Sequence, residues 1–259
     1  MTMNYKLRTK HGLSLMEEAV VIAVIAMLVV FGLPAVRALF RSIESEGGAK
    51  AMISAALSSG RAIAAKEQHY AGIRFQNKYQ QDGKGCQYMI FIVHDFDKTD
   101  LANGFRAVEG LQPIKLPDSV GVMDLKLGSP NPDQIVDGDD KINEDWEVAD
   151  TTAFSILFSP SGKLVIHDVQ VRNRDGETNN NSKDDIFNTK FNVEDKKTAM
   201  FYQDDYPSDG FDKEPSRNSF RIYDMGIFEK VDKDSRYNDY LRDLEVIYIN
   251  PYTGTMIEK

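Results

Sequence analysis

The first residue that suggests a chemical role is Glu17, a carboxylate at the start of an apolar run, Ala19 to Val36, that contains no charged side chain. The 18 residues of this run would extend about 27 Å as an α-helix, close to the hydrocarbon thickness of a bilayer. A carboxylate at the centre of a bilayer costs roughly 2.5–3.5 kcal/mol, so an acid within a membrane helix needs a partner. The alternative is that Glu17 and Glu18 lie at the level of the lipid headgroups, where they are partly solvated.

Gly12 lies before the apolar run and directly after a short basic stretch that carries Lys6, Arg8 and Lys10. An ordinary secretory signal has its cleavage site after the apolar region, so cleavage there would remove that region. Cleavage between Gly12 and Leu13 would instead keep the apolar segment and create a new amino terminus. The basic stretch also predicts orientation, with the amino terminus in the cytoplasm and the rest of the chain translocated.

This combination resembles the type III signal of type IV pilins and type II secretion pseudopilins. Counted from Leu13, Glu17 is the fifth residue and Pro34 the twenty-second, both of them signature positions of that family. The resemblance implies that a prepilin peptidase cuts after Gly12 and methylates the amine of Leu13. It also implies that Glu17 pairs with the amino terminus of a neighbouring subunit and that Pro34 kinks the helix. Glu18 adds a second acid beside Glu17, which departs from the usual pattern.

After the apolar run, hydrophobic residues recur at three- and four-residue steps, as Ile53, Ala56 and Leu57 do. This spacing is typical of an amphipathic helix with one face on a domain. We expect one nearly continuous helix from Leu13 to about Tyr70. The predicted segments are a cleaved leader (1–12), a transmembrane half-helix (13–36), an amphipathic half-helix (37–70) and a β-rich domain (71–259).

Short apolar runs separated by turn residues predict an antiparallel β domain. The expected strands are 73–75, 88–93, 105–108, 120–123, 154–158, 164–167, 220–223, 246–249 and 256–257, with a short helix over 236–244. The hairpin around the turn Ser159-Pro160-Ser161-Gly162 resembles an element of the H-type minor pseudopilins. Residues 172–218 are polar and predict a long mobile insertion with at most one short strand, at 199–202.

The predicted fold class is α+β, with the long amino-terminal helix packed on an antiparallel sheet. The resemblance implies a structural role as an H-type minor pseudopilin in the periplasmic pseudopilus of a type II secretion system. The chain would be anchored in the bacterial inner membrane with its β domain in the periplasm, and its partners would be other pseudopilins and the prepilin peptidase. A minor pilin of a type IV pilus, for adhesion or DNA uptake, is the alternative within the family.

Composition argues against several other classes. The net charge is −9, and loss of the leader with its three cations makes it −12, which argues against nucleic-acid binding through a general basic surface. The single cysteine, Cys86, excludes an intramolecular disulfide and a multi-cysteine metal site. No cofactor or metal is expected. Calcium binding by the acidic loops 137–140 and 175–177 is a minor alternative, because calcium prefers oxygen ligands.

Two His-Asp pairs leave room for a membrane-tethered enzyme or a ligand-binding domain. His94-Asp95 and His167-Asp168 each follow a predicted strand. Polar residues at strand ends are ordinary, and no catalytic signature motif is present, so the prediction is a protein that is not an enzyme. A pocket that joined His94, His167 and Cys86 would favour the enzyme.

Overall fold

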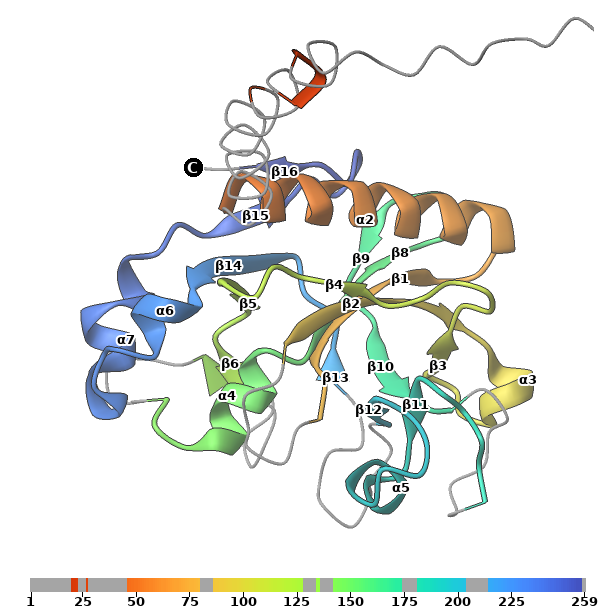
Figure 1. Ribbon diagram of the computed structural model, residues 1–259. Coiled ribbons are helices and arrows are strands. Elements are labelled where there is room, and N and C mark those ends of the chain that lie inside the picture. Colours follow the sequence, from red (N-terminus) through yellow and green to blue (C-terminus); the bar gives the residue numbers. More distant parts are fainter. Residues whose placement is uncertain are drawn as a thin grey trace, which may run out of the picture. The chain divides into compact units, whose positions relative to one another are not determined.

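A computed structural model describes residues 20–22, 27, 46–79, 86–127, 134–135, 142–173, 181–203 and 214–257. The chain divides into two compact units, residues 1–43 and 44–259. In the first unit the described residues, 20–22 and 27, are helical. The second unit is a mixed α/β domain with curled, mainly antiparallel sheets (Figure 1).

The main sheet has eight strands, and its central strands are β2 and β1. In spatial order it contains β13 (Glu214–Pro215), β10 (Asp168–Val171), β3 (Gly104–Ala107), β2 (Gln87–His94), β1 (Ala71–Asn77), β8 (Phe154–Phe158) and β9 (Leu164–Val165), with β4 (Ile114–Lys115) paired to β2. All of its pairs are antiparallel except β10 with β3.

Three smaller sheets complete the described strands. One contains, in order, β16 (Met256–Ile257), β15 (Ile247–Ile249), β14 (Ser219–Asp224) and β5 (Val120–Met123). The other two are the parallel pair β11 (Phe187–Asn188) with β12 (Phe201–Tyr202) and the antiparallel pair β6 (Lys126–Leu127) with β7 (Gln134–Ile135).

One long helix and several short ones surround these sheets. The α-helices are α2 (Glu46–Glu67), α3 (Phe96–Thr99), α4 (Asp145–Thr151), α5 (Lys190–Glu194), α6 (Met225–Phe228) and α7 (Arg236–Asp239), and the 3₁₀ turns are η2 (Lys233–Ser235) and η3 (Leu241–Asp243). The antiparallel β domain and its helix over residues 46–67 agree with the predicted α+β class in this coarse form.

Helix α2 covers one face of both larger sheets (Figure 1). Ile53, Ala56 and Leu57 are almost completely buried there, as their spacing predicts. The cluster that they enter includes Phe75 and Phe154, whose rings stack with centroids 4.8 Å apart. The helix ends at Glu67, three residues before the predicted end, because Gln68 adopts a left-handed conformation with φ of 56°.

A close approach of two glycines helps to set how closely α2 lies against the sheet. A Cβ on Gly60 of α2 would lie 3.1 Å from the Cα of Gly72 in β1. Gly72 is also crowded from the neighbouring strand, since a Cβ there would lie 1.9 Å from the backbone oxygen of Ile156 in β8. Side chains at these positions would push the helix and the strands apart.

The prediction of at most one short strand within residues 172–218 was wrong, because the described part of this polar segment contains more elements. Residues 181–203 contain β11, α5 and β12, and residues 214–218 contain β13. Ile186, Phe187 and Phe201 are at most 1 % exposed and form a second core on the face of the main sheet opposite α2. This segment therefore covers a sheet face that would otherwise expose apolar side chains to water.

Candidate functional site

The predicted assembly residues Gly12, Leu13, Glu17 and Pro34 lie outside the described residues. Within the predicted membrane segment, Val20, Val21, Ile22 and Met27 are described, and each side chain is more than half exposed. Among the helices that the structure describes, none combines the length and the apolar character that a membrane crossing requires.

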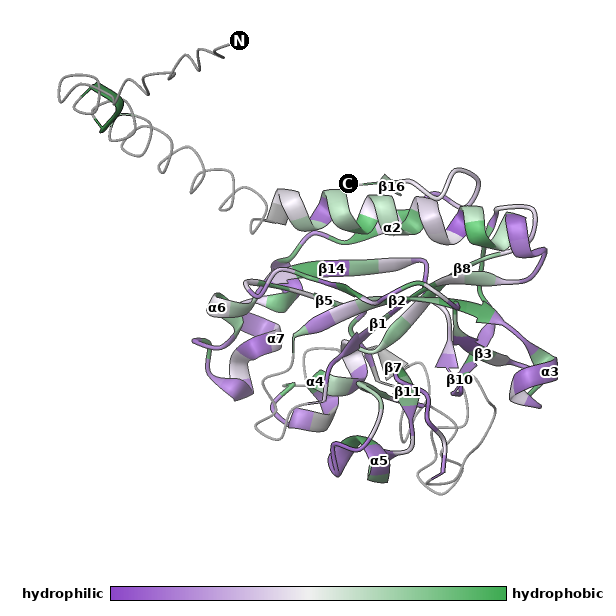
Figure 2. Ribbon diagram, turned by 45° about the vertical axis from the view of Figure 1, so that its right-hand side comes forward, coloured by the Kyte–Doolittle hydropathy of each residue, from purple (hydrophilic) through white to green (hydrophobic). Residues whose placement is uncertain are grey.

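The outer face of α2 is built from small side chains. Its exposed residues include Ala51, Ala55, Ser58, Ser59, Ala62 and Ala65. Ser58 and Ser59 donate their hydroxyl hydrogens to the carbonyls of Ser54 and Ala55, one turn earlier, at 3.0 and 2.9 Å. Because these hydroxyls are already bonded within the helix, this face combines small volume with few unmet polar groups. Figure 2 shows the mixed hydropathy of α2.

Arg61 anchors α2 to two turns of the β domain. Its Nε donates to the backbone oxygen of Gly162 at 2.8 Å, and its Nη1 donates to that of Thr253 at 2.9 Å. Gly162 belongs to the predicted β8–β9 turn, where its φ of +75° explains the choice of glycine. The predicted hairpin is confirmed, since β8 and β9 pair antiparallel around this turn.

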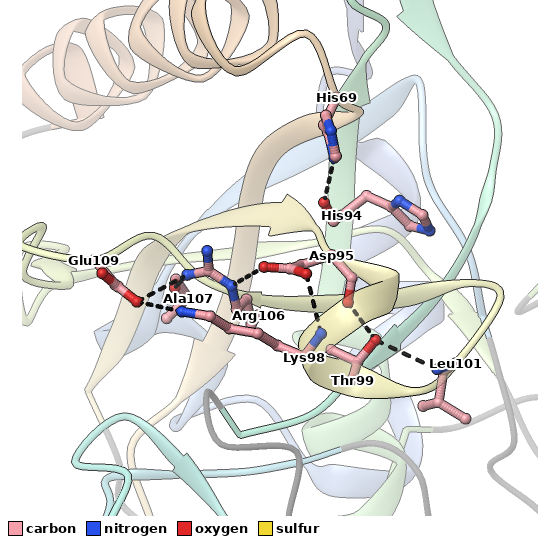
Figure 3. Close-up of polar contacts among 9 residues, drawn as sticks. All are labelled: His69, His94, Asp95, Lys98, Thr99, Leu101, Arg106, Ala107 and Glu109. Atoms are coloured by element: carbon pink, nitrogen blue, oxygen red, sulfur yellow. Dashed lines mark hydrogen bonds and ion pairs between the residues drawn. The ribbon is translucent and has the colours of Figure 1, made fainter.

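Asp95, from the first His-Asp pair, makes structural contacts (Figure 3). Its side chain accepts a hydrogen bond from the backbone N–H of Lys98 at 3.1 Å, which caps α3, and forms an ion pair with Arg106 at 2.6 Å. Burial opposes ionisation, but these two bonds prevail and lower the pKa of Asp95.

His94 and His167, the two predicted pair histidines, meet in the folded domain. Their ring centroids lie 6.2 Å apart, and the ring of His69 lies 6.4 Å from that of His94. A ring nitrogen of each histidine lies against a backbone oxygen: His69 Nδ1 on His94 at 2.9 Å, His94 Nε2 on Ala102 at 2.9 Å, and His167 Nδ1 on Asp168 at 2.6 Å. The sequence did not predict that His69 joins this group, because only the turn after α2 brings its ring close to that of His94.

Cys86 lies apart from the histidines, just before the opposite end of β2. Its thiol sulfur lies 3.1 Å from Oδ1 of Asp118, which also pairs with Lys115 at 2.7 Å. The pKa of Lys115 is raised mainly by its hydrogen bond with Asp118 and, to a smaller extent, by its hydrogen bond with Cys86. The pocket of His94, His167 and Cys86 that would favour an enzyme is therefore not formed.

A buried charge cluster lies on the side of the main sheet away from α2, and sequence reasoning missed it. The Nε of Arg217 donates to Asp124 Oδ2 at 2.5 Å, and its Nη2 donates to Glu214 Oε1 at 2.5 Å. The side chains of Arg217 and Asp124 are 3 % and 1 % exposed. Arg74, also buried, donates to Ser155 Oγ at 3.2 Å, and its charge acts on the nearby Glu214 carboxylate.

Burial dominates the titration of this cluster. It raises the pKa of Asp124 to about 6, against the lowering effect of Arg217. Burial and the neighbouring Asp124 carboxylate together raise the pKa of Glu214. Burial outweighs the nearby positive charges of Arg217 and Arg74, so the folded domain favours protonation of these two carboxyl groups.

The described residues contain no group of three or more His, Cys, Asp or Glu side chains placed to hold a metal ion. The acidic loops 137–140 and 175–177, for which calcium binding was the minor alternative, lie outside the described residues. Comparison of the chain with protein-family models, with curated proteins and with solved structures found no match.

Proposed function

We propose that this chain is a minor pseudopilin, a structural subunit of the periplasmic pseudopilus of a type II secretion system. The observation that carries the proposal is the register of Gly12, Glu17 and Pro34 around an uncharged apolar run. Processing site, membrane acid and proline fall at the spacing that the pilin-like family uses.

The two faces of α2 support this role. The inner face, with Ile53 and Leu57, fastens the helix to the β domain. The outer face, with Ala51, Ala55 and Ala62, presents small side chains that let neighbouring helices approach closely. A helix with these two faces suits a pilin-like subunit, whose helix belongs both to its own domain and to the interior of a fibre.

The exposed apolar side chains of the first unit also suit the proposal. The described residues Val20, Val21, Ile22 and Met27 are helical, and each is more than half exposed. A membrane before assembly, and neighbouring helices afterwards, would cover these apolar side chains. The subunit is then held in the inner membrane until assembly, and its partners are the prepilin peptidase and other pseudopilins.

Glu17→Ala is expected to leave leader cleavage and membrane insertion intact but to reduce recruitment into the fibre by roughly tenfold or more. The reason is that a neighbouring subunit's amino terminus and the Glu17 carboxylate each carry a buried charge that the other offsets. The measurement is the yield of crosslinks to other pseudopilins, together with secretion in a strain that lacks the native protein.

Glu18→Ala is the matched control, because it removes an adjacent acid outside the signature position. It is expected to assemble at close to the native level. A defect confined to Glu18→Ala would move the pairing role to Glu18. Normal assembly by both single variants and by the double variant would contradict charge pairing as the assembly step.

A further inference from the structure

The small sheet β16–β15–β14–β5 has one face in the main core and one face outside it. Phe220 and Ile222 of β14 point into the core beneath α2. The alternate residues, Arg221 and Tyr223, therefore point to the outer face. The register pairs Ser219 with Tyr248 and Tyr248 with Ile257, which places these side chains on the outer face as well.

Short helices cover only the β5 half of this outer face. Tyr223 packs in a cluster with Phe228 of α6 and Leu241 of η3, and is 4 % exposed. The β15–β16 half is open, since Tyr248 is 38 % exposed and Ile257 is 41 % exposed. Arg221 lies at the boundary between the covered half and the open half.

Arg221 is partly buried and has no carboxylate partner among the residues that the structure describes. Its Nε donates to the backbone oxygen of Leu244 at 3.2 Å, and no described carboxylate lies within 4.0 Å of its guanidinium. The side chains of Tyr237 and Tyr248 are close enough to affect it electrostatically. Burial lowers the pKa of Arg221 by desolvation, a cost that a carboxylate partner would offset.

Among the described arginines, Arg106 pairs with Asp95 and Arg217 pairs with Asp124. The side chains of Arg61, Arg221 and Arg236 instead donate to backbone oxygens. Of these three, Arg221 lies at the boundary of the open half of the outer face. Arginine and tyrosine are also the residue types enriched where protein interfaces bind most tightly. A charged centre with aromatic and aliphatic neighbours is therefore suited to a protein ligand.

We propose that Arg221, Tyr237, Tyr248 and Ile257 form a docking surface for a carboxylate-bearing segment of a different protein subunit. The carboxylate accepts hydrogen bonds from the free edge of the guanidinium, and the tyrosines and Ile257 cover the adjoining apolar contact. A second copy of this chain is disfavoured because both partners would carry the same large negative charge. The identity of the partner as a fibre subunit rests on the proposed function.

The test places a photo-crosslinking phenylalanine analogue at Tyr248 of the full chain, in the native host. A single main adduct with a different protein is expected, with the joined peptide beside an aspartate or glutamate. Arg221→Met, which keeps the aliphatic stem, should lower the adduct yield roughly tenfold, as for loss of one interface hot spot. Arg221→Lys should lower it less, since it keeps the charge but loses the fork geometry.

Two controls separate docking from folding. Adducts from the same analogue at Tyr252, which is 69 % exposed in the β15–β16 turn, should not change with Arg221→Met. The melting temperature of Arg221→Met should remain that of the native chain. Arg221→Glu, combined with replacement of the partner's acidic residue by lysine, reverses both charges and should restore the adduct.

Adduct yield that is unchanged by Arg221→Met would overturn the proposal, as would adducts only with a second copy of this chain or no adduct at all. Failure of the proposed function has a different signature. If the amino terminus is unprocessed while the adduct still depends on Arg221, the docking surface stands and its partner is not a fibre subunit.

Discussion

Replacing Arg217 with methionine is expected to lower the free energy of unfolding of the β domain by about 3–5 kcal/mol at pH 7. The Arg217 side chain is 3 % exposed, and its guanidinium bridges Asp124 and Glu214. Methionine fills much of the same volume but leaves both carboxylates without the charge that offsets their burial. Urea unfolding, followed by the fluorescence of the single tryptophan, Trp146, measures the loss in the unit that begins at Glu44.

The loss should depend on pH in a definite direction. Asp124 has a folded pKa of about 6 against an ordinary value of 3.8, so its stabilising contribution is present below about pH 4 and is lost as the pH rises through 6. Removing Arg217 removes a cation that lowers both carboxyl pKa values, so these rise further. The difference between variant and native unit should therefore be larger at pH 7.5 than at pH 4.5.

An exposed ion pair provides the control. Lys98 and Glu109 are joined at 2.7 Å, but their side chains are 45 % and 61 % exposed. Lys98→Met should therefore cost less than about 1 kcal/mol. Equal losses for Arg217→Met and Lys98→Met, or a loss for Arg217→Met that grows toward acid pH, would contradict the assignment of a buried charge cluster.

Gly72→Ala is the second substitution with a large expected effect, a destabilisation of about 3 kcal/mol or more. The added methyl group would lie 1.9 Å from the Ile156 oxygen, which belongs to the backbone of β8 and cannot rotate away. Strands β1 and β8 would have to separate, and β1 is paired on both sides. The melting temperature of the unit that begins at Glu44 reports this loss.

Gly110→Ala is the matched control for Gly72→Ala. A Cβ on Gly110 meets no atom within 4 Å, so its cost comes from its φ of +77° alone, about 1 kcal/mol. The difference in melting temperature between the two variants therefore reports the steric clash at Gly72. A melting temperature for Gly72→Ala equal to that of Gly110→Ala would show that β1 and β8 are not held at this separation.

The sequence predicts the strands best where the apolar run is continuous. β5 and β8 match their predicted ranges, 120–123 and 154–158, because buried strands of this type carry their signal in consecutive residues. The burial of α2 was likewise predictable from the three- and four-residue spacing of Ile53, Ala56 and Leu57. In these elements local pattern and tertiary packing agree.

The second core was not predictable in this way. Ile186, Phe187 and Phe201 are few and widely spaced in a polar segment, so no periodicity signals their burial. They become buried because the main sheet already offers an apolar face, which is a property of the assembled fold. The parallel pairing of β10 with β3 is also set by topology and has no local signature.

The charge cluster and the histidine group depend on the same long-range topology. Arg217 and Asp124 are 93 residues apart in the chain, and only the arrangement of the sheets brings them to hydrogen-bond distance. A buried arginine in strand β1, Arg74, was a local signal that a polar network lies under the sheet. The candidate assembly residues Gly12, Glu17 and Pro34 differ from these groups, because their spacing in the sequence is enough to single them out.

The mass of the mature amino terminus tests the central claim most directly. We expect protein purified from the membranes of its host to begin at Leu13, with a methylated amine, and to contain 247 of the 259 residues. Gly12→Val should instead accumulate as the uncut precursor in the membrane. A native chain that retains residues 1–12, or one that is cut after Val36, would contradict the pseudopilin proposal.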